Sequence, residues 1–281
     1  MKTFRESEQR ALRELLADDD PQVLSLLGEQ FASMGEAGCE FLEGVCVGSN
    51  LAARRGAQRI LDGLRESRSR QAFEEFCDRP AEDCDLEEGC WRLARTRYWH
   101  LDVDRYRARL DEMAREFKGR LTGRETPRSA IEVGNHYLFR LLGFRGNTQD
   151  YYDPDNSYLN RVLDRRLGIP ISLSIVYLLL GRRLHLPLFG VNLPGHFLIK
   201  WQSPDVEFFI DPFHLGQLLT AAECCAMAER LGARVSRAGL TSVSDRVVLA
   251  RLCRNLRALY AVDDPVRAAW LESCVERLTR R

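Results

Sequence analysis

Strand-like alternation is confined to one short stretch of this chain, and that restriction limits the fold more than any other feature. Three runs between residues 186 and 211 alternate apolar and polar side chains, with a Pro-Gly turn at 194–195 and the polar turn SPD at 203–205 between them. Nearly all of the remaining sequence has the apolar spacing of helices. We therefore expect an α+β fold that contains a small antiparallel sheet.

Helical patterns fill both ends of the chain. The run ESEQRALRELL, the segment that follows Pro21 and the segment LAARRGAQRILDGLRES each have helical spacing. Asp85 is a candidate N-cap with Glu88 as its capping-box partner. A long helix is expected from Asp102, with one apolar stripe formed by Val103, Tyr106, Leu110, Met113 and Phe117. The last two helices, joined by an Asp-Asp-Pro turn, predict a hairpin of the tetratricopeptide kind.

These patterns predict three parts: a helical N-terminal domain (1–122), a mixed core (127–220) and C-terminal helices (221–281). Within the core, SYLNRVLDRRLG predicts a short helix closed by Gly168. The apolar run PISLSIVYLLLGRRLHL predicts a buried central helix that starts at Pro170. A strand is the competing interpretation of that run, because ISLSIVY is β-branched and alternating.

The composition of the chain argues against several classes of function. Lys plus Arg is 41 and Asp plus Glu is 41, so the neutral chain has no overall attraction to nucleic acid or to an anionic membrane. No run approaches 18 apolar residues, and the charged, amphipathic start lacks the apolar region of a signal peptide, so we expect a cytoplasmic protein. Nine cysteines without a CxxC pair predict free thiols, with no metal and no cofactor.

One histidine and one aspartate stand where an acyl-transfer site would need them. Such a site uses a nucleophile at a helix start, a histidine on a strand and an aspartate that orients the imidazole. His196 opens the strand HFLIKWQ, and Asp211 ends the strand VEFFID. In a hairpin the start of one strand lies beside the end of its partner, so we expect a hydrogen bond between these two side chains. A polar residue at a sheet margin is the alternative for His196 alone.

The run NSYLNRVLDRRLGIPISLSIVYLLLGRRLHLPLFGVNLPGHFLIKW, followed by FFIDPF, resembles the bacterial SirB-type branch of the transglutaminase-like superfamily. The resemblance covers about residues 130–220, and more weakly the helices on either side. It implies a papain-like core in which His196 and Asp211 are the catalytic histidine and aspartate. The cysteine of the superfamily's Gly-x-Cys motif corresponds here to Pro170, which carries no nucleophile.

Other candidate residues surround this predicted site. Ser172 is the nearest hydroxyl to the missing nucleophile, although a position two residues along a helix is turned by about 200°. A packing or capping role is the alternative for Ser172. Asn156, Tyr152 and His214 are candidate binding residues, while turn formation alone also explains Asn156.

Three functions are compatible with the sequence. The empty nucleophile position favours a non-catalytic transglutaminase-like module that binds a protein or peptide, whose identity the residues do not specify. The alternative is a serine-dependent hydrolase or acyl-transferase that uses Ser172, His196 and Asp211. A third hypothesis is a helical-repeat adaptor in which the central core serves only as a spacer. A hydroxyl or thiol within hydrogen-bond reach of His196 would favour the enzyme.

Overall fold

The computed structural model describes residues 5–18 and 20–280, so the first four residues of the amphipathic start lie outside the described part. The chain divides into two compact units. One unit comprises Met1–Phe73 with Arg95–His100, and the other comprises Glu74–Ala94 with Leu101–Arg281. All candidate site residues belong to the second unit. In the described part, no helix combines the length and apolarity needed to span a bilayer.

The first unit is helical and is built around its own apolar core. Its helices are α1 (Glu6–Leu16), α2 (Pro21–Ser33), α3 (Glu36–Cys46) and the first part of α4 (Leu51–Cys77). The Asp20 side chain caps α2 by accepting the N–H of Gln22, and Pro21 occupies the first helical turn, where its missing N–H costs nothing. The core of this unit includes Leu16, Phe31, Leu42 and Ala57.

The second unit contains the remaining helices. Those before the sheet are α5 (Leu86–Arg95), α6 (Val103–Lys118), α7 (Pro127–Asn135), a π-helical continuation (His136–Leu141), α8 (Leu159–Arg165) and α9 (Pro170–Arg183). Those after it are α10 (Ala221–Arg230), α11 (Asp245–Tyr260) and α12 (Pro265–Thr279). Short 3-10 turns occupy Ala81–Asp83, Pro154–Asn156, Pro212–His214 and Arg237–Gly239.

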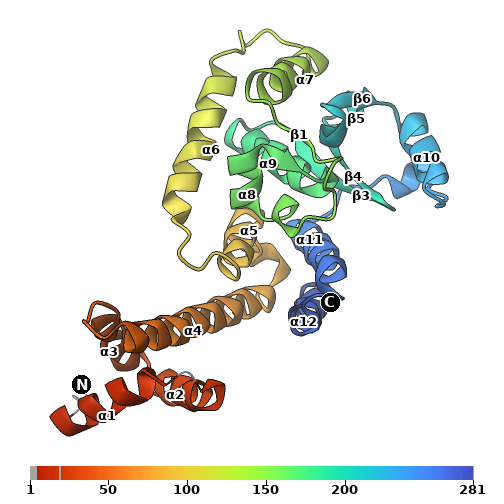
Figure 1. Ribbon diagram of the computed structural model, residues 1–281. Helices are drawn as coiled ribbons and strands as arrows, with labels where there is room; N and C mark the ends of the chain where they lie inside the picture. Colours follow the sequence, from red (N-terminus) through yellow and green to blue (C-terminus); the bar gives the residue numbers. More distant parts are fainter. Residues whose placement is uncertain (1–4, 19, 281) are drawn as a thin grey trace. The chain divides into compact units, whose positions relative to one another are not determined.

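Helix α9 is the centre of this unit. Every residue from Pro170 to Gly181 is buried, as expected for a helix that is apolar on all sides. In Figure 1 it lies between α6 and the sheet, and it contacts both of them. The helical interpretation of this segment is confirmed, and the competing strand is not formed.

The main sheet has four antiparallel strands in the order β3-β4-β5-β6. They are β3 (Leu188–Leu193), β4 (His196–Gln202), β5 (Glu207–Asp211) and β6 (Gln217–Leu219). The turn between β3 and β4 includes Gly195 at φ +73°, a backbone conformation that favours glycine. The first three strands were expected from the sequence, whereas β6 was not.

The expected α+β class is confirmed, with a helical N-terminal part, a small antiparallel sheet and the C-terminal hairpin of α11 and α12. Some local predictions were wrong. Helix α8 ends at Arg165 instead of closing at Gly168, and Arg166 takes the left-handed conformation at φ +57°. Leu167–Gly168 then forms a short parallel strand (β2) beside Arg145–Gly146 (β1).

Asp85 caps α5 as expected, because its carboxylate accepts the N–H of Glu88 at 2.7 Å. The reciprocal bond of a capping box is not formed. Instead, the Glu88 carboxylate pairs with Arg92 and Arg79, at 2.7 and 3.1 Å. Two nearby guanidinium groups therefore replace a backbone N–H as its partners.

Candidate functional site

Two side chains at one end of the sheet form the centre of the site. His196 is the first residue of β4 and Asp211 is the last residue of β5, and antiparallel pairing brings these two ends together. His196 Nε2 lies 2.8 Å from Asp211 Oδ2, so the expected hydrogen bond is present. Both side chains are buried, at 8% and 0% exposure.

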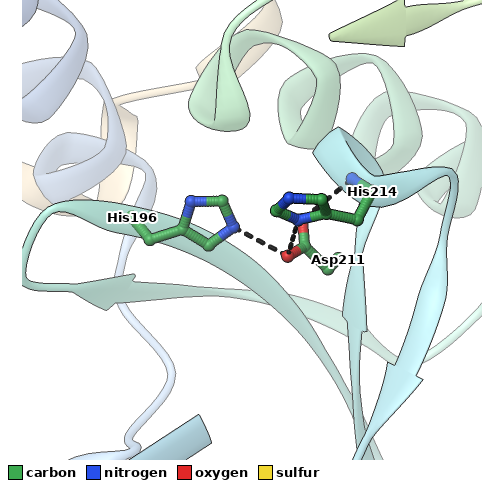
Figure 2. Close-up of side chains that lie close together, drawn as sticks. All are labelled: His196, Asp211 and His214. Atoms are coloured by element: carbon green, nitrogen blue, oxygen red, sulfur yellow. Dashed lines mark hydrogen bonds and ion pairs between the residues drawn. The ribbon is translucent and has the colours of Figure 1, made fainter. Parts of the chain in front are cut away.

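A second histidine binds the same carboxylate oxygen. His214 ends the 3-10 turn that follows β5, and its Nδ1 lies 2.7 Å from Asp211 Oδ2. Figure 2 shows both imidazole rings directed at the one carboxylate. The other oxygen, Oδ1, accepts the backbone N–H groups of Phe213 at 3.1 Å and His214 at 3.3 Å. The carboxylate is therefore fixed from both sides, while the His214 side chain stays 56% exposed.

The surroundings of Asp211 favour its ionised form. Burial alone raises the pKa of a carboxyl group. Here the hydrogen bonds and charges of His196 and His214 outweigh that effect, and the pKa of Asp211 lies below its ordinary value. A buried carboxylate at neutral pH is thus available to orient both imidazoles.

The other ring nitrogen of His196, Nδ1, does not take part in the contact with Asp211. In the neutral imidazole, the contact with Asp211 places the proton on Nε2 and leaves Nδ1 as an acceptor. Within residues 5–18 and 20–280, the imidazole ring of His196 makes no other hydrogen bond, and the ring of Phe213 packs edge-on against it with the ring centroids 6.2 Å apart. Nδ1 is therefore the atom that could take a proton from a nucleophile or accept a hydrogen bond from a ligand.

The nucleophile position offers no reactive group. Pro170 begins α9 and lies in the same pocket wall as His196. Ser172 Oγ donates to the carbonyl of Asn156 at 2.6 Å and accepts the N–H of Ile169 at 3.0 Å. Ser174 Oγ donates to the carbonyl of Pro170 at 2.8 Å. Throughout the described part of the chain, neither hydroxyl bonds to His196, so the structure does not join Ser172 to the predicted dyad.

The cysteines are also separate from this pair. Burial raises the pKa of Cys84 to about 11 and that of Cys224 to about 12. The charge of Asp211 makes a smaller contribution to the shift of Cys224, which packs in the apolar cluster behind β5. No cysteine among the described residues lines the hollows beside His196 or hydrogen-bonds to its ring.

His196 and Gly195 lie between two hollows. The first, of about 190 Å³, is lined by Pro170 and His196, by the loop residues Tyr151 and Tyr152, and by residues of α11 that include Arg251, Asn255 and Ala258. The second, of about 460 Å³, is lined by both histidines and by residues that include Gln217, Glu223 and Arg230. Tyr152, a predicted binding residue, is 76% exposed at the first hollow.

The contribution of α11 to the first hollow was missed from the sequence. Arg251 and Asn255 lie more than fifty residues beyond His196, in a helix whose amphipathic pattern resembles that of any packed hairpin. No motif marks them. Only their contact with the pocket identifies them as candidate binding residues.

Asn156 lies under the loop that carries the two tyrosines. Its side chain is fully buried, and its Nδ2 donates to the carbonyls of Asp150 at 2.7 Å and Tyr151 at 3.2 Å. Its Oδ1 accepts from Asn147 Nδ2 at 2.9 Å. These bonds hold the loop in place, and Asn156 does not line either hollow. Its direct role in binding stays a prediction.

The central helix, the antiparallel sheet and the histidine–aspartate pair at the sheet end define a transglutaminase-like core. The family model of the transglutaminase-like superfamily matches residues 104–254. The chain belongs to this superfamily.

Several curated proteins are similar to the chain. A UPF0162 protein of Xylella fastidiosa (strain Temecula1) is 37% identical over 178 residues, which cover 61% of this chain and 63% of that protein. A UPF0162 protein of Pseudomonas aeruginosa is 36% identical over 165 residues, covering 57% of this chain and 59% of that protein. F-box only protein 21 of Homo sapiens is 38% identical over 143 residues, which are 48% of this chain and 22% of that protein.

The similarity to the first of these relatives thus spans somewhat less than two thirds of its length. No solved structure matches the chain.

Proposed function

We propose that this protein is a non-catalytic transglutaminase-like module of the SirB-type branch that binds an extended peptide segment carrying a carboxylate. The observation that carries the proposal is the first hollow, whose wall contains Pro170 at the nucleophile position together with His196 and Arg251. Such a pocket keeps groups that recognise a polypeptide and lacks the group that would cleave or acylate it.

Arg251 supports the choice of a carboxylate. Its guanidinium lies 3.4 Å from Asn192 Oδ1 and, among the described residues, forms no ion pair. Burial lowers the pKa of Arg251, and the neighbouring charge of Arg254 lowers it further. A half-buried cation without a counter-ion is stabilised when an anionic ligand supplies one, and arginine binds carboxylates through paired hydrogen bonds.

The remaining walls suit the apolar part of a peptide. Ile169, Ile171 and Phe197 line the hollow together with the exposed rings of Tyr151 and Tyr152. Tyrosines at the mouth of a pocket supply large contact area at low entropic cost. The free Nδ1 of His196 can accept one backbone N–H of the ligand.

The serine-dependent hydrolase or acyl-transferase remains the second candidate. It is favoured by the intact pair of His196 and Asp211, but the Ser172 hydroxyl already contacts three backbone groups, the N–H and carbonyl of Ile169 and the carbonyl of Asn156. Activation of Ser172 would require loss of these bonds and reorientation of the side chain towards His196. We therefore rank this candidate below peptide binding.

Fluorescence anisotropy with labelled ten-residue peptides tests the binding proposal. Three peptides are compared: one with a central glutamate and an amidated end, a neutral one with a free C-terminal carboxylate, and a neutral amidated one. We expect at least one carboxylate peptide to bind more tightly than the neutral amidated peptide. Loss of a charged hydrogen bond is worth about 1.5–3 kcal/mol, so Arg251→Gln should weaken that binding by at least about tenfold.

Arg254→Gln is the matched control, because it removes the same charge from the same helix outside the pocket lining. Equal binding of all three peptides, or equal losses in the two arginine variants, would contradict the proposal. A separate assay on activated esters compares the wild type with Ser172→Ala and His196→Ala. Turnover well above background that disappears in both variants would favour the serine enzyme instead.

A further inference from the structure

We propose that His196, Asp211 and His214 form a binding site for one divalent first-row transition-metal ion, such as Zn²⁺. Each residue offers one ligand atom, and these three atoms lie within 4.8 Å of one another. The described part of the chain contains no other group of three His, Cys, Asp or Glu side chains with such convergence. The proposal goes beyond peptide binding and does not depend on it. When Nε2 of His196 binds the ion, Nδ1 carries the ring proton, so it donates to a ligand carbonyl instead of accepting a peptide N–H.

The distances in the group are close to those of a coordination sphere. Metal–nitrogen and metal–carboxylate bonds to zinc are about 2.0–2.2 Å, so neighbouring ligand atoms are on the order of 3 Å apart. Asp211 Oδ2 lies 2.8 Å from His196 Nε2 and 2.7 Å from His214 Nδ1. Two of the three distances between ligand atoms therefore already suit coordination of one ion. The ion would replace the two protons that now form the hydrogen bonds between the imidazoles and the carboxylate.

The chemistry of the donors also fits a zinc-class ion. Two imidazole nitrogens with one carboxylate oxygen are ligands that zinc, cobalt and nickel accept. Asp211 is held by backbone N–H groups on Oδ1, which leaves Oδ2 directed at the histidines. Such outer hydrogen bonds fix the orientation of metal-binding carboxylates. For a neutral imidazole, ligation requires only that the proton move to the other ring nitrogen.

The position of the group leaves room for an additional ligand. His196 comes from a strand and His214 from a short turn, and both line the second hollow beside Glu223 and Arg230. Three protein ligands leave a fourth position of a tetrahedral ion open, and here it would face this hollow. Water or an oxygen ligand could occupy that position.

Cobalt titration tests the site. The full chain is stripped with a chelator, kept reduced, and titrated with Co²⁺ alone while its visible absorption is recorded. Zn²⁺ binding is then measured by calorimetry and by the change in melting temperature, which rises when an ion binds only the folded state. We expect one equivalent of metal without the intense near-ultraviolet absorption of thiolate ligands.

The half-exposed His214 gives the decisive variant, because His214→Ala removes a ligand without emptying the core. We expect it to weaken metal binding by at least about tenfold and to abolish the rise in melting temperature. His136→Gln, a change at an exposed histidine in the π-helical turn, should leave both unchanged. The proposal is overturned if the wild type takes up no metal, if His214→Ala binds as the wild type does, or if thiolate absorption accompanies binding.

Discussion

Replacement of Ser172 by alanine distinguishes a structural hydroxyl from a catalytic one. The Ser172 hydroxyl accepts the N–H of Ile169 and donates to the carbonyl of Asn156, and all three residues are buried. Alanine therefore leaves one backbone donor and one backbone acceptor without these partners. The change also weakens the connection between the start of α9 and the loop that ends at Asn156.

The magnitude follows from the two orphaned groups. An unsatisfied buried donor or acceptor costs about 1–3 kcal/mol. With some relaxation, we expect Ser172→Ala to lower the free energy of unfolding by about 3 kcal/mol. In a domain of 150–250 residues, 1 kcal/mol corresponds to about 2–4 °C, so the melting temperature should fall by about 6–12 °C.

Ser174→Ala is the matched control, because it removes a buried hydroxyl from the same helical turn. Ser174 Oγ only adds a second donor to the carbonyl of Pro170, which is a normal helix acceptor. Its loss leaves no buried group unsatisfied, so we expect a change below about 0.5 kcal/mol. Urea unfolding followed by circular dichroism measures both variants. Equal stability of the two variants would refute this reasoning, and lost turnover at unchanged stability would assign Ser172 a catalytic role.

Two further substitutions and one labelling experiment test other parts of the structure. Asn156→Asp removes both amide donors from a fully buried side chain and should cost about 3 kcal/mol or more in urea unfolding; a loss below 1 kcal/mol would mean that the loop is held by other bonds. Gly216 has φ +77°, and a Cβ at this position would lie 2.0 Å from Asn135 Oδ1. Gly216→Ala should therefore lower both the free energy of unfolding and the affinity for Co²⁺. An unchanged free energy of unfolding together with an unchanged affinity would be inconsistent with this packing. The pKa values of Cys84 and Cys224 are raised to about 11 and 12, so fewer than about 1% of these thiols are ionised at pH 8.5. We therefore expect mass spectrometry to find both cysteines unmodified after iodoacetamide treatment of the folded protein. Rapid labelling of either cysteine would show that the core is open.

The sheet and its polar end were predictable because their signals are local. The alternation of HFLIKWQ and VEFFID fixes two strands, and the short polar turn between them fixes their antiparallel pairing. The hydrogen bond between His196 and Asp211 follows from that pairing. His214 is only three residues from Asp211, so its presence near the same carboxylate was also within reach of sequence reasoning.

The environment of these residues was not predictable in the same way. Ser172 was a candidate nucleophile on spacing, but its partners are set by the approach of the Asn156 loop to the start of α9. Arg251 enters the pocket because α11 packs near α9, a contact between segments about seventy residues apart. The short parallel pair of β1 and β2 also depends on residues distant in sequence.

Local patterns in the sequence specify most of the elements around the site, but not β1, β2 or β6, and they place His196 and Asp211 at strand ends. Periodicity and turn chemistry act between neighbours, so α9, the first three strands and the order of His196 and Asp211 follow from local patterns. Tertiary packing settles which groups share a cavity and which hydroxyls are already bonded to the backbone. Those outcomes depend on how distant segments pack, and packing is a property of the whole core that no short stretch of sequence contains.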